Sequence, residues 1–185
     1  MTRLLLLAAS ALTLTACASA SMPMPGRGMS PMAPMAPMAT PTRAMDYARM
    51  AAASDLYEIQ SSQVALQVSQ NPETRRFAQM LIDHHTQTTA TLMAAARSAG
   101  MTPPPPMLDG RKAAMIEQLR RTPAGQFDMA FLMQQVPAHQ EALTLHSTYA
   151  QRGDNAVLRG AAASAVPIVQ QHLTMAQQMH GAMMR

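Results

Sequence analysis

A run of four prolines, Pro103–Pro106, interrupts a sequence whose other local signals after residue 45 favour helix. Proline has no amide hydrogen and fixes φ, so this run cannot continue a helix and forms a stiff connection. On both sides of it, apolar residues recur with a helical period, and no segment shows the alternation of a strand. The sequence therefore predicts an all-α domain in two halves, joined by a proline-rich crossover.

Capping residues and helix breakers divide these halves further. Asn71 followed by Pro72 is typical of a helix start, and Asp109 and Asp154 are expected to cap two later helices. Five helices are expected, at about residues 46–69, 72–99, 110–121, 126–152 and 155–179. Four of them are long, and the short one follows the prolines. This pattern predicts a four-helix bundle with a short extra helix in its midpoint connection.

The N-terminus has the features of an export signal. Arg3 precedes the short apolar run Leu4–Leu14, which is less than the ~20 residues that a membrane span needs. The residues Leu14-Thr-Ala-Cys17 resemble a bacterial lipobox, so we expect a signal peptide over residues 1–16 and a lipid anchor on Cys17. The residue after the cysteine is Ala18 and not Asp, which resembles an outer-membrane sorting signal. We therefore expect the lipid-anchored protein at the periplasmic face of the outer membrane. The alternative is an ordinary signal peptide cleaved nearby.

Residues 17–44 have a different composition. Pro-Met-Ala occurs three times in Pro31–Ala39, and seven of the 20 methionines lie between residues 22 and 45. We expect a flexible or polyproline-like tether ahead of a bundle domain over residues 45–180 and a Met-rich tail over 181–185. Thioether sulfur suits Cu(I), so the tether could collect copper; a low-complexity linker is the alternative.

Several classes of function are not supported. The formal net charge is only +4, the arginines are scattered and there is no tryptophan, which argues against a nucleic-acid partner. The sequence has no nucleophile elbow, phosphate-binding glycine loop or His-Glu-x-x-His motif. Cys17, the only cysteine, belongs to the signal. We therefore expect a protein that is not an enzyme. Its expected partner is the membrane, through the lipid on Cys17, and the sequence does not identify a protein partner.

Histidines occur on the apolar stripes of three expected helices. His84, His139 and His172 each lie on a different helix, and Glu58 lies on the first helix. One glutamate and three imidazoles from separate helices could converge on one transition-metal ion. Such ligands suit Zn(II), Cu(II), Ni(II) or Fe(II), and the sequence does not choose among them.

The alternative interpretation needs no metal. Buried neutral histidines can bond to backbone carbonyls or to Asp83 or Asp128 and form a structural network. His146 is about 10 Å along the helix axis from His139, so these two cannot easily share one ion. Together with His85 and His180, His146 is a secondary candidate.

At these residues the chain resembles a known family, the bacterial domain of unknown function family 4142. The segments that carry the resemblance are Asp55–Glu58, Asn71–His84, Gln126–Phe131, Pro137–His139 and Pro167–Leu173. It covers about residues 46–179 and implies a ferritin-like, exported protein with no established activity. The segment from Phe127 to Gln140 also resembles the related family 305, some of whose members are linked to copper.

Departures from the family pattern limit the chemistry. Gln60 stands where the pattern has Glu, and Ala138 where it usually has Asp. A ferritin-type di-iron centre also needs two Glu-x-x-His pairs, and this sequence has none. We therefore exclude ferroxidase chemistry and keep two hypotheses. One is an exported lipoprotein that binds copper or another transition metal; the other is a non-catalytic structural or stress-associated envelope protein without metal.

Overall fold

The computed structural model describes residues 40–185. The expected signal peptide, Cys17 and most of the expected tether lie outside this range. All regular secondary structure in the described part is helical: α1 (Ala44–Val68), α2 (Pro72–Ser98), α3 (Gly110–Arg121), α4 (Ala124–Arg152) and α5 (Ala156–Met183). This confirms the prediction of an all-α fold with four long helices and one short one. None of these helices combines the length and apolar character needed to cross a bilayer.

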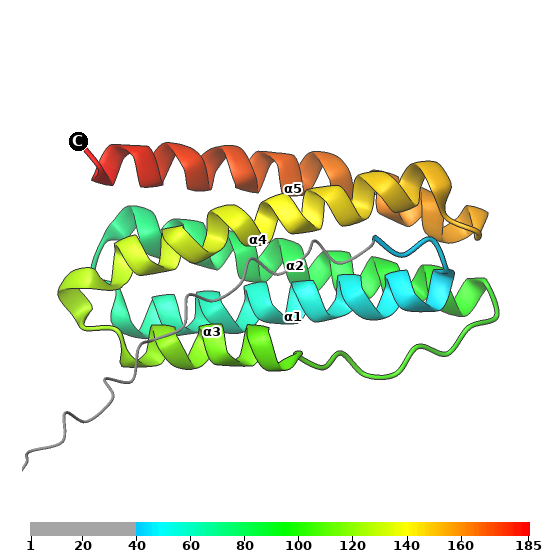
Figure 1. Cartoon of the computed structure of the whole chain (residues 1–185), viewed down its shortest axis with the longest axis horizontal. Coiled ribbons are helices and arrows are strands. Elements are labelled where there is room, and N and C mark those ends of the chain that lie inside the picture. Colours follow the sequence, from blue (N-terminus) through cyan, green and yellow to red (C-terminus); the bar gives the residue numbers. More distant parts are fainter. Residues whose placement is uncertain (1–39) are drawn as a thin grey trace, which may run out of the picture. The chain divides into compact units, whose positions relative to one another are not determined.

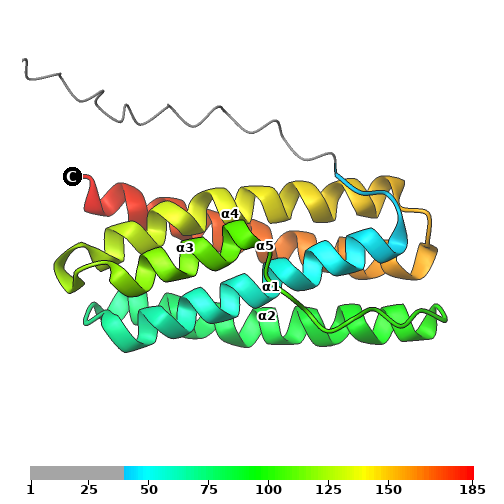
Figure 2. The same ribbon diagram turned by 60° about the horizontal axis from the view of Figure 1, so that its bottom comes forward.

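The four long helices form an antiparallel bundle (Figure 1). α1 packs on α2 and α4, and α5 packs on the other sides of α4 and α2, so the order around the bundle is α1, α2, α5, α4. α2 ends at the opposite end of the bundle from the start of α4. The prolines and α3 therefore run back along the outside, where α3 lies beside α1 and α4 (Figure 2). The expected crossover at the midpoint of the chain is confirmed.

Local sequence sets most of the helix ends. The Asn71 side chain accepts from Glu73 N (2.9 Å), and the Asp109 side chain accepts from Lys112 N (2.7 Å). Each bond satisfies a backbone donor that has no partner inside the helix. Past the end of α2, Gly100 has φ +73°, a left-handed conformation that glycine adopts without a Cβ penalty.

The predicted N-cap of the fifth helix, Asp154, is wrong by one residue. Asn155, and not Asp154, is the N-cap of α5, and its side chain accepts from Val157 N and Leu158 N. Asp154 instead accepts at Oδ1 from the backbone N of Ala44 and from the Tyr149 hydroxyl. It therefore ties the start of α1 to the junction of α4 and α5.

A polar layer divides the interior of the bundle into two apolar clusters. One cluster, near the α1–α2 turn, is centred on Phe77, Leu81 and Phe131. The other, near the α4–α5 turn, contains Tyr47 and Tyr149, whose rings stack with centroids 3.9 Å apart. Full burial of each large apolar side chain contributes about 1.5–3 kcal/mol to folding, whereas buried polar groups cost free energy unless they are paired. The buried residues between the clusters include Asp55, Glu58, His85, His139 and His172.

Candidate metal centre

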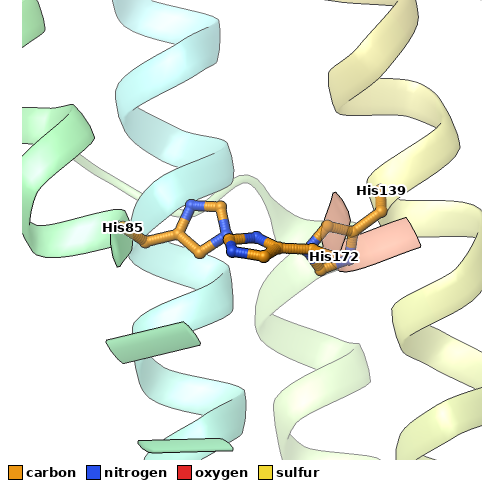
Figure 3. A group of neighbouring side chains, drawn as sticks. All are labelled: His85, His139 and His172. Carbon is orange, nitrogen blue, oxygen red and sulfur yellow. The ribbon is translucent and has the colours of Figure 1, made fainter. Parts of the chain in front are cut away.

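Three histidines from three helices meet in the polar layer. His85 is on α2, His139 on α4 and His172 on α5, and none is more than 1% exposed. Figure 3 shows their rings directed toward one another. One nitrogen from each ring lies within 4.8 Å of the corresponding nitrogens of the other two. Three potential metal-ligating atoms are therefore gathered in the interior of the bundle.

Each ring is oriented by a bond at one nitrogen. His85 Nδ1 lies 2.8 Å from Asp55 Oδ1, and His139 Nδ1 lies 2.9 Å from the carbonyl oxygen of Gln135. His172 Nε2 lies 2.8 Å from His84 Nδ1. A histidine that donates at one nitrogen carries a free electron pair on the other, which is the pair that binds metals.

The second nitrogen of each ring has no hydrogen-bond partner within residues 40–185. These atoms are Nε2 of His85, Nε2 of His139 and Nδ1 of His172, and all are inaccessible to solvent. Because His85 and His139 both face acceptors at Nδ1, each presents an electron pair at Nε2 when its ring is neutral. Such an arrangement fits a bound cation better than an apolar core.

Asp55 anchors this arrangement from α1. Its Oδ1 faces His85, and its Oδ2 accepts from the hydroxyls of Thr88 and Thr89, each at 2.9 Å. The carboxylate is only 3% exposed and is held by three donors from α2. This is the carboxylate–histidine pairing that fixes the tautomer and orientation of metal-ligating histidines.

The surroundings shift the pKa values of the three histidines differently. Burial acts to lower the pKa of His85, but the hydrogen bond to Asp55 and the charges of Asp55 and Glu58 outweigh it, so the pKa is raised. Burial lowers the pKa of His139, although the charge of Glu58 opposes the shift. Burial and the neighbouring imidazoles lower the pKa of His172 to about 2. His139 and His172 are therefore neutral at pH 7, as metal ligands must be.

Glu58 lies beside the three histidines but not among their free nitrogens. Its Oε1 is 3.9 Å from His139 Nδ1, which is the ring nitrogen that faces the Gln135 carbonyl. The side chain is fully buried, and neither carboxylate oxygen has a hydrogen-bond partner in the described part of the chain. Glu58 was predicted as a ligand; the structure places its carboxylate beside the bonded nitrogen of His139, Nδ1.

The structure also separates the two adjacent histidines of α2. His84, the predicted candidate, is half-buried and stacks on His172 with ring centroids 5.1 Å apart. Its neighbour His85 belongs to the group in which one ring nitrogen of each residue lies within 4.8 Å of the others. The predicted His139 and His172 do come together.

Two other histidines lie outside this group. His146 is buried and bonds through Nδ1 to the Tyr47 hydroxyl at 2.9 Å. Burial lowers its pKa to about 4. His180 lies near the end of α5 and is half-buried.

Fold and site together define a class: an antiparallel four-helix bundle with three converging histidines in its interior. The model of the family described as Domain of unknown function (DUF4142) matches residues 29–179, and the chain belongs to this family. The family suggested by the sequence segments is therefore confirmed. No curated protein sequence matches the chain.

Solved structures share the fold. The DUF305 fragment from Deinococcus radiodurans superposes with a TM-score of 0.67 at 16% identity, covering 78% of this chain and 98% of the fragment. CopM in the Cu(II)-bound form gives a TM-score of 0.64 at 17% identity, covering 76% of this chain and 97% of CopM. The Cu(I)-bound form of CopM gives 0.64 at 16% identity, with coverage of 76% and 96%. At such identities the similarity establishes the fold alone.

Proposed function

We propose that this protein is a non-catalytic metal-binding protein that holds one transition-metal ion, copper by preference, through His85, His139 and His172. Two observations together carry the proposal: one nitrogen of each of three buried imidazole rings lies within 4.8 Å of the others, and in each ring one nitrogen is bonded while the other has no partner within residues 40–185. A bound ion would accept all three electron pairs. The chain's own contribution is to hold these nitrogens in place and away from water.

The donor atoms favour copper as the first ion to test. Imidazole nitrogen suits Cu, Zn, Ni and Fe, and at a given site Cu(II) binds most tightly among the common divalent ions. CopM, which shares the fold, has been solved with Cu(II) and with Cu(I). Both considerations support copper.

Binding without catalysis is supported by the enclosure of the site. The three rings are at most 1% exposed, and apolar clusters lie on both sides of the polar layer. A catalytic metal keeps an open position for water or substrate. A closed site of this kind suits storage, transfer or structural stabilisation.

The residues around the ligands would position them. Asp55 would fix His85, and His84 would fix His172 through the bond between the two rings. We therefore assign His84 a positioning role and His85 the role of ligand from α2.

The cellular location is a proposal from sequence alone. The lipobox-like residues Leu14–Cys17 support export, with a lipid on Cys17 that anchors the protein at the periplasmic face of the outer membrane. Metabolic labelling with a fatty acid, lost in Cys17→Ser, tests this part independently of metal binding.

The metal proposal is tested with the mature protein, purified without an affinity tag. The metal content is measured first, followed by titration with Cu(I), Cu(II) and Zn(II). We expect near-stoichiometric metal bound tighter than micromolar, and its loss in the triple variant H85A/H139A/H172A. The matched control is H180A, which should keep the metal.

Metal-dependent stability separates the two hypotheses. If the ion cross-links three helices, added metal raises the melting temperature (Tm) of the wild type but not of the triple variant. A triple variant with a lower Tm, beside a wild type that shows neither metal nor a metal-dependent Tm, would support a purely structural histidine network instead.

A further inference from the structure

The Glu58 carboxylate lies in the middle of the bundle without a hydrogen-bond donor from the described residues to stabilise its charge. It is fully buried, and neither of its oxygens has a hydrogen-bond partner within residues 40–185. A carboxylate enclosed in this way is strongly unfavourable unless a positive charge lies nearby. Its position therefore favours a cation bound in the same polar layer.

No lysine or arginine forms an ion pair with Glu58 in the described part of the chain. Lys112, the buried lysine of α3, lies 3.9 Å from Glu141 Oε2 and forms no ion pair with Glu58. Glu58 lies instead 3.9 Å from His139 Nδ1. The charge of Glu58 also acts on both His139 and His85, so the carboxylate is electrostatically coupled to two of the three proposed ligands.

The second buried acid, Asp55, is in a different situation. Its oxygens are held by His85, Thr88 and Thr89, so its charge is stabilised by donors of the protein itself. An ion that binds the three imidazoles needs them neutral and displaces any proton on His85, so the centre then carries the charges of Asp55 and Glu58. A doubly charged ion neutralises this group, whereas a singly charged ion leaves one negative charge buried.

We infer that Glu58 makes the centre selective for a divalent over a monovalent ion, acting through its charge and not as a ligand. This inference rests on the proposed function, since it presupposes that an ion binds at the three histidines. The centre would thus prefer Cu(II) or Zn(II) to Cu(I).

The size of the effect follows from the geometry. Glu58 Oε1 is 3.9 Å from one ring nitrogen of His139. An ion bound to the other ring nitrogen, about 2 Å beyond it, would be at most about 8 Å from that oxygen, so the effect worked out at about 8 Å is a lower limit. With an effective dielectric constant near 20, the attraction changes affinity about 30-fold for each unit of charge on the ion. Loss of the Glu58 charge should therefore weaken a divalent ion about 1000-fold and a monovalent ion about 30-fold.

The test compares Zn(II) with Ag(I), two ions that do not change oxidation state during titration. Because methionine sulfur elsewhere in the chain can bind Ag(I), occupancy is followed by NMR at the ¹⁵N-labelled histidine ring nitrogens. Glu58→Gln removes the charge and keeps the shape. Glu58→Asp keeps the charge, and Glu141→Gln is the matched control at an exposed glutamate. Circular dichroism checks that each variant is folded.

In E58Q we expect the ratio of Zn(II) to Ag(I) affinity to fall about 30-fold, and in E58D and E141Q to stay within about threefold of wild type. An unchanged ratio in folded E58Q overturns the inference while leaving the metal centre intact. If E58Q does not fold, an unchanged ratio in E58D supports the inference and a collapsed ratio overturns it. A wild type that binds neither ion at the histidines refutes the proposed function itself.

Discussion

Replacement of Asp55 by Asn tests how the proposed metal centre is organised. Asp55 accepts from His85 Nδ1 at 2.8 Å and from the hydroxyls of Thr88 and Thr89 at 2.9 Å. In Asp55→Asn, the amide oxygen can still accept from His85, and the amide NH₂ can donate to the hydroxyls after they rotate. The variant thus keeps the shape of the site and removes its charge.

The expected losses can be worked from these contacts. Removing such an orienting partner typically costs 10–100-fold in metal affinity, or about 1.4–2.7 kcal/mol. In the metal-free protein, three hydrogen bonds to a charged acceptor become neutral ones, and each loses about 1 kcal/mol. The loss in the free energy of unfolding should be at most about 3 kcal/mol, because the variant no longer buries a charge.

Metal titration and urea denaturation measure the two effects separately. Asp83→Asn is the matched control, because Asp83 is an exposed aspartate of α2 whose only side-chain hydrogen bond is to Gln79. D83N should leave the metal affinity unchanged. If D55N binds metal as tightly as wild type, Asp55 does not orient His85 for coordination, and the assignment of the free Nε2 as a ligand loses its basis.

Two further predictions concern the apolar cluster at the α4–α5 end. The pKa of His146 is lowered from 6.5 to about 4 by burial, so this residue contributes stability that is present above pH 6.5 and is lost as the pH falls toward 4. Urea denaturation of the metal-free protein at pH 6.5 and pH 4 measures this loss. In His146→Gln, the unfolding free energy should fall by about 3 kcal/mol less between these pH values than in the wild type. An equal fall in both proteins would contradict the lowered pKa of His146. In Gly153→Ala, the new Cβ would lie 2.5 Å from ring carbons of Tyr149, which stacks on Tyr47. The backbone oxygen of Tyr149 would lie 2.7 Å from the new Cβ as well. We expect a loss of about 1–3 kcal/mol by denaturation, against no loss in Gly160→Ala, where the space is open. An unchanged G153A would show that both the ring and the backbone of Tyr149 shift to make room.

The helices could be predicted from sequence because their signals are local. Asn71, Asp109 and Gly100 act within one turn of their own position, and the proline run excludes helix whatever packs against it. The four-helix bundle follows from the number and length of the helices. The cap of α5 was misassigned because Asp154 and Asn155 are both good capping residues, and only the contact of Asp154 with α1 decides between them.

The face of α2 was harder to define. Its large buried side chains are Phe77, Leu81 and Leu92. Successive residues of a helix are turned by about 100° around its axis. By this rule, His84 and His85 lie almost equally close to the centre of the apolar stripe that these three side chains define. The buried Ala78 and Ala96 move that centre toward His85, but alanine carries little weight in an apolar pattern. Counting the alanines would have favoured His85.

Contacts between helices could not be predicted in the same way. The sequence suggested Asp83 or Asp128 as partners for buried histidines, whereas the structure pairs His85 with Asp55 on α1. The position of Glu58 also depends on which edge of the His139 ring faces α1. Helical periodicity gives the face of a residue, but the rotation of its ring depends on packing.

The partners of the polar layer distinguish a metal centre from a structural network. A bundle gains little from a layer of buried polar side chains, since apolar residues of similar volume would be at least as stabilising. A structural network satisfies its members, as Asp55 is satisfied by three donors. Here one nitrogen of each imidazole is bonded, while the other nitrogen, Gln135 Oε1 and both oxygens of Glu58 have no partner within residues 40–185. A cation bound there, as we propose, would account for the unpartnered ring nitrogens and for the charge of Glu58, which hydrogen bonds within the layer leave unsatisfied.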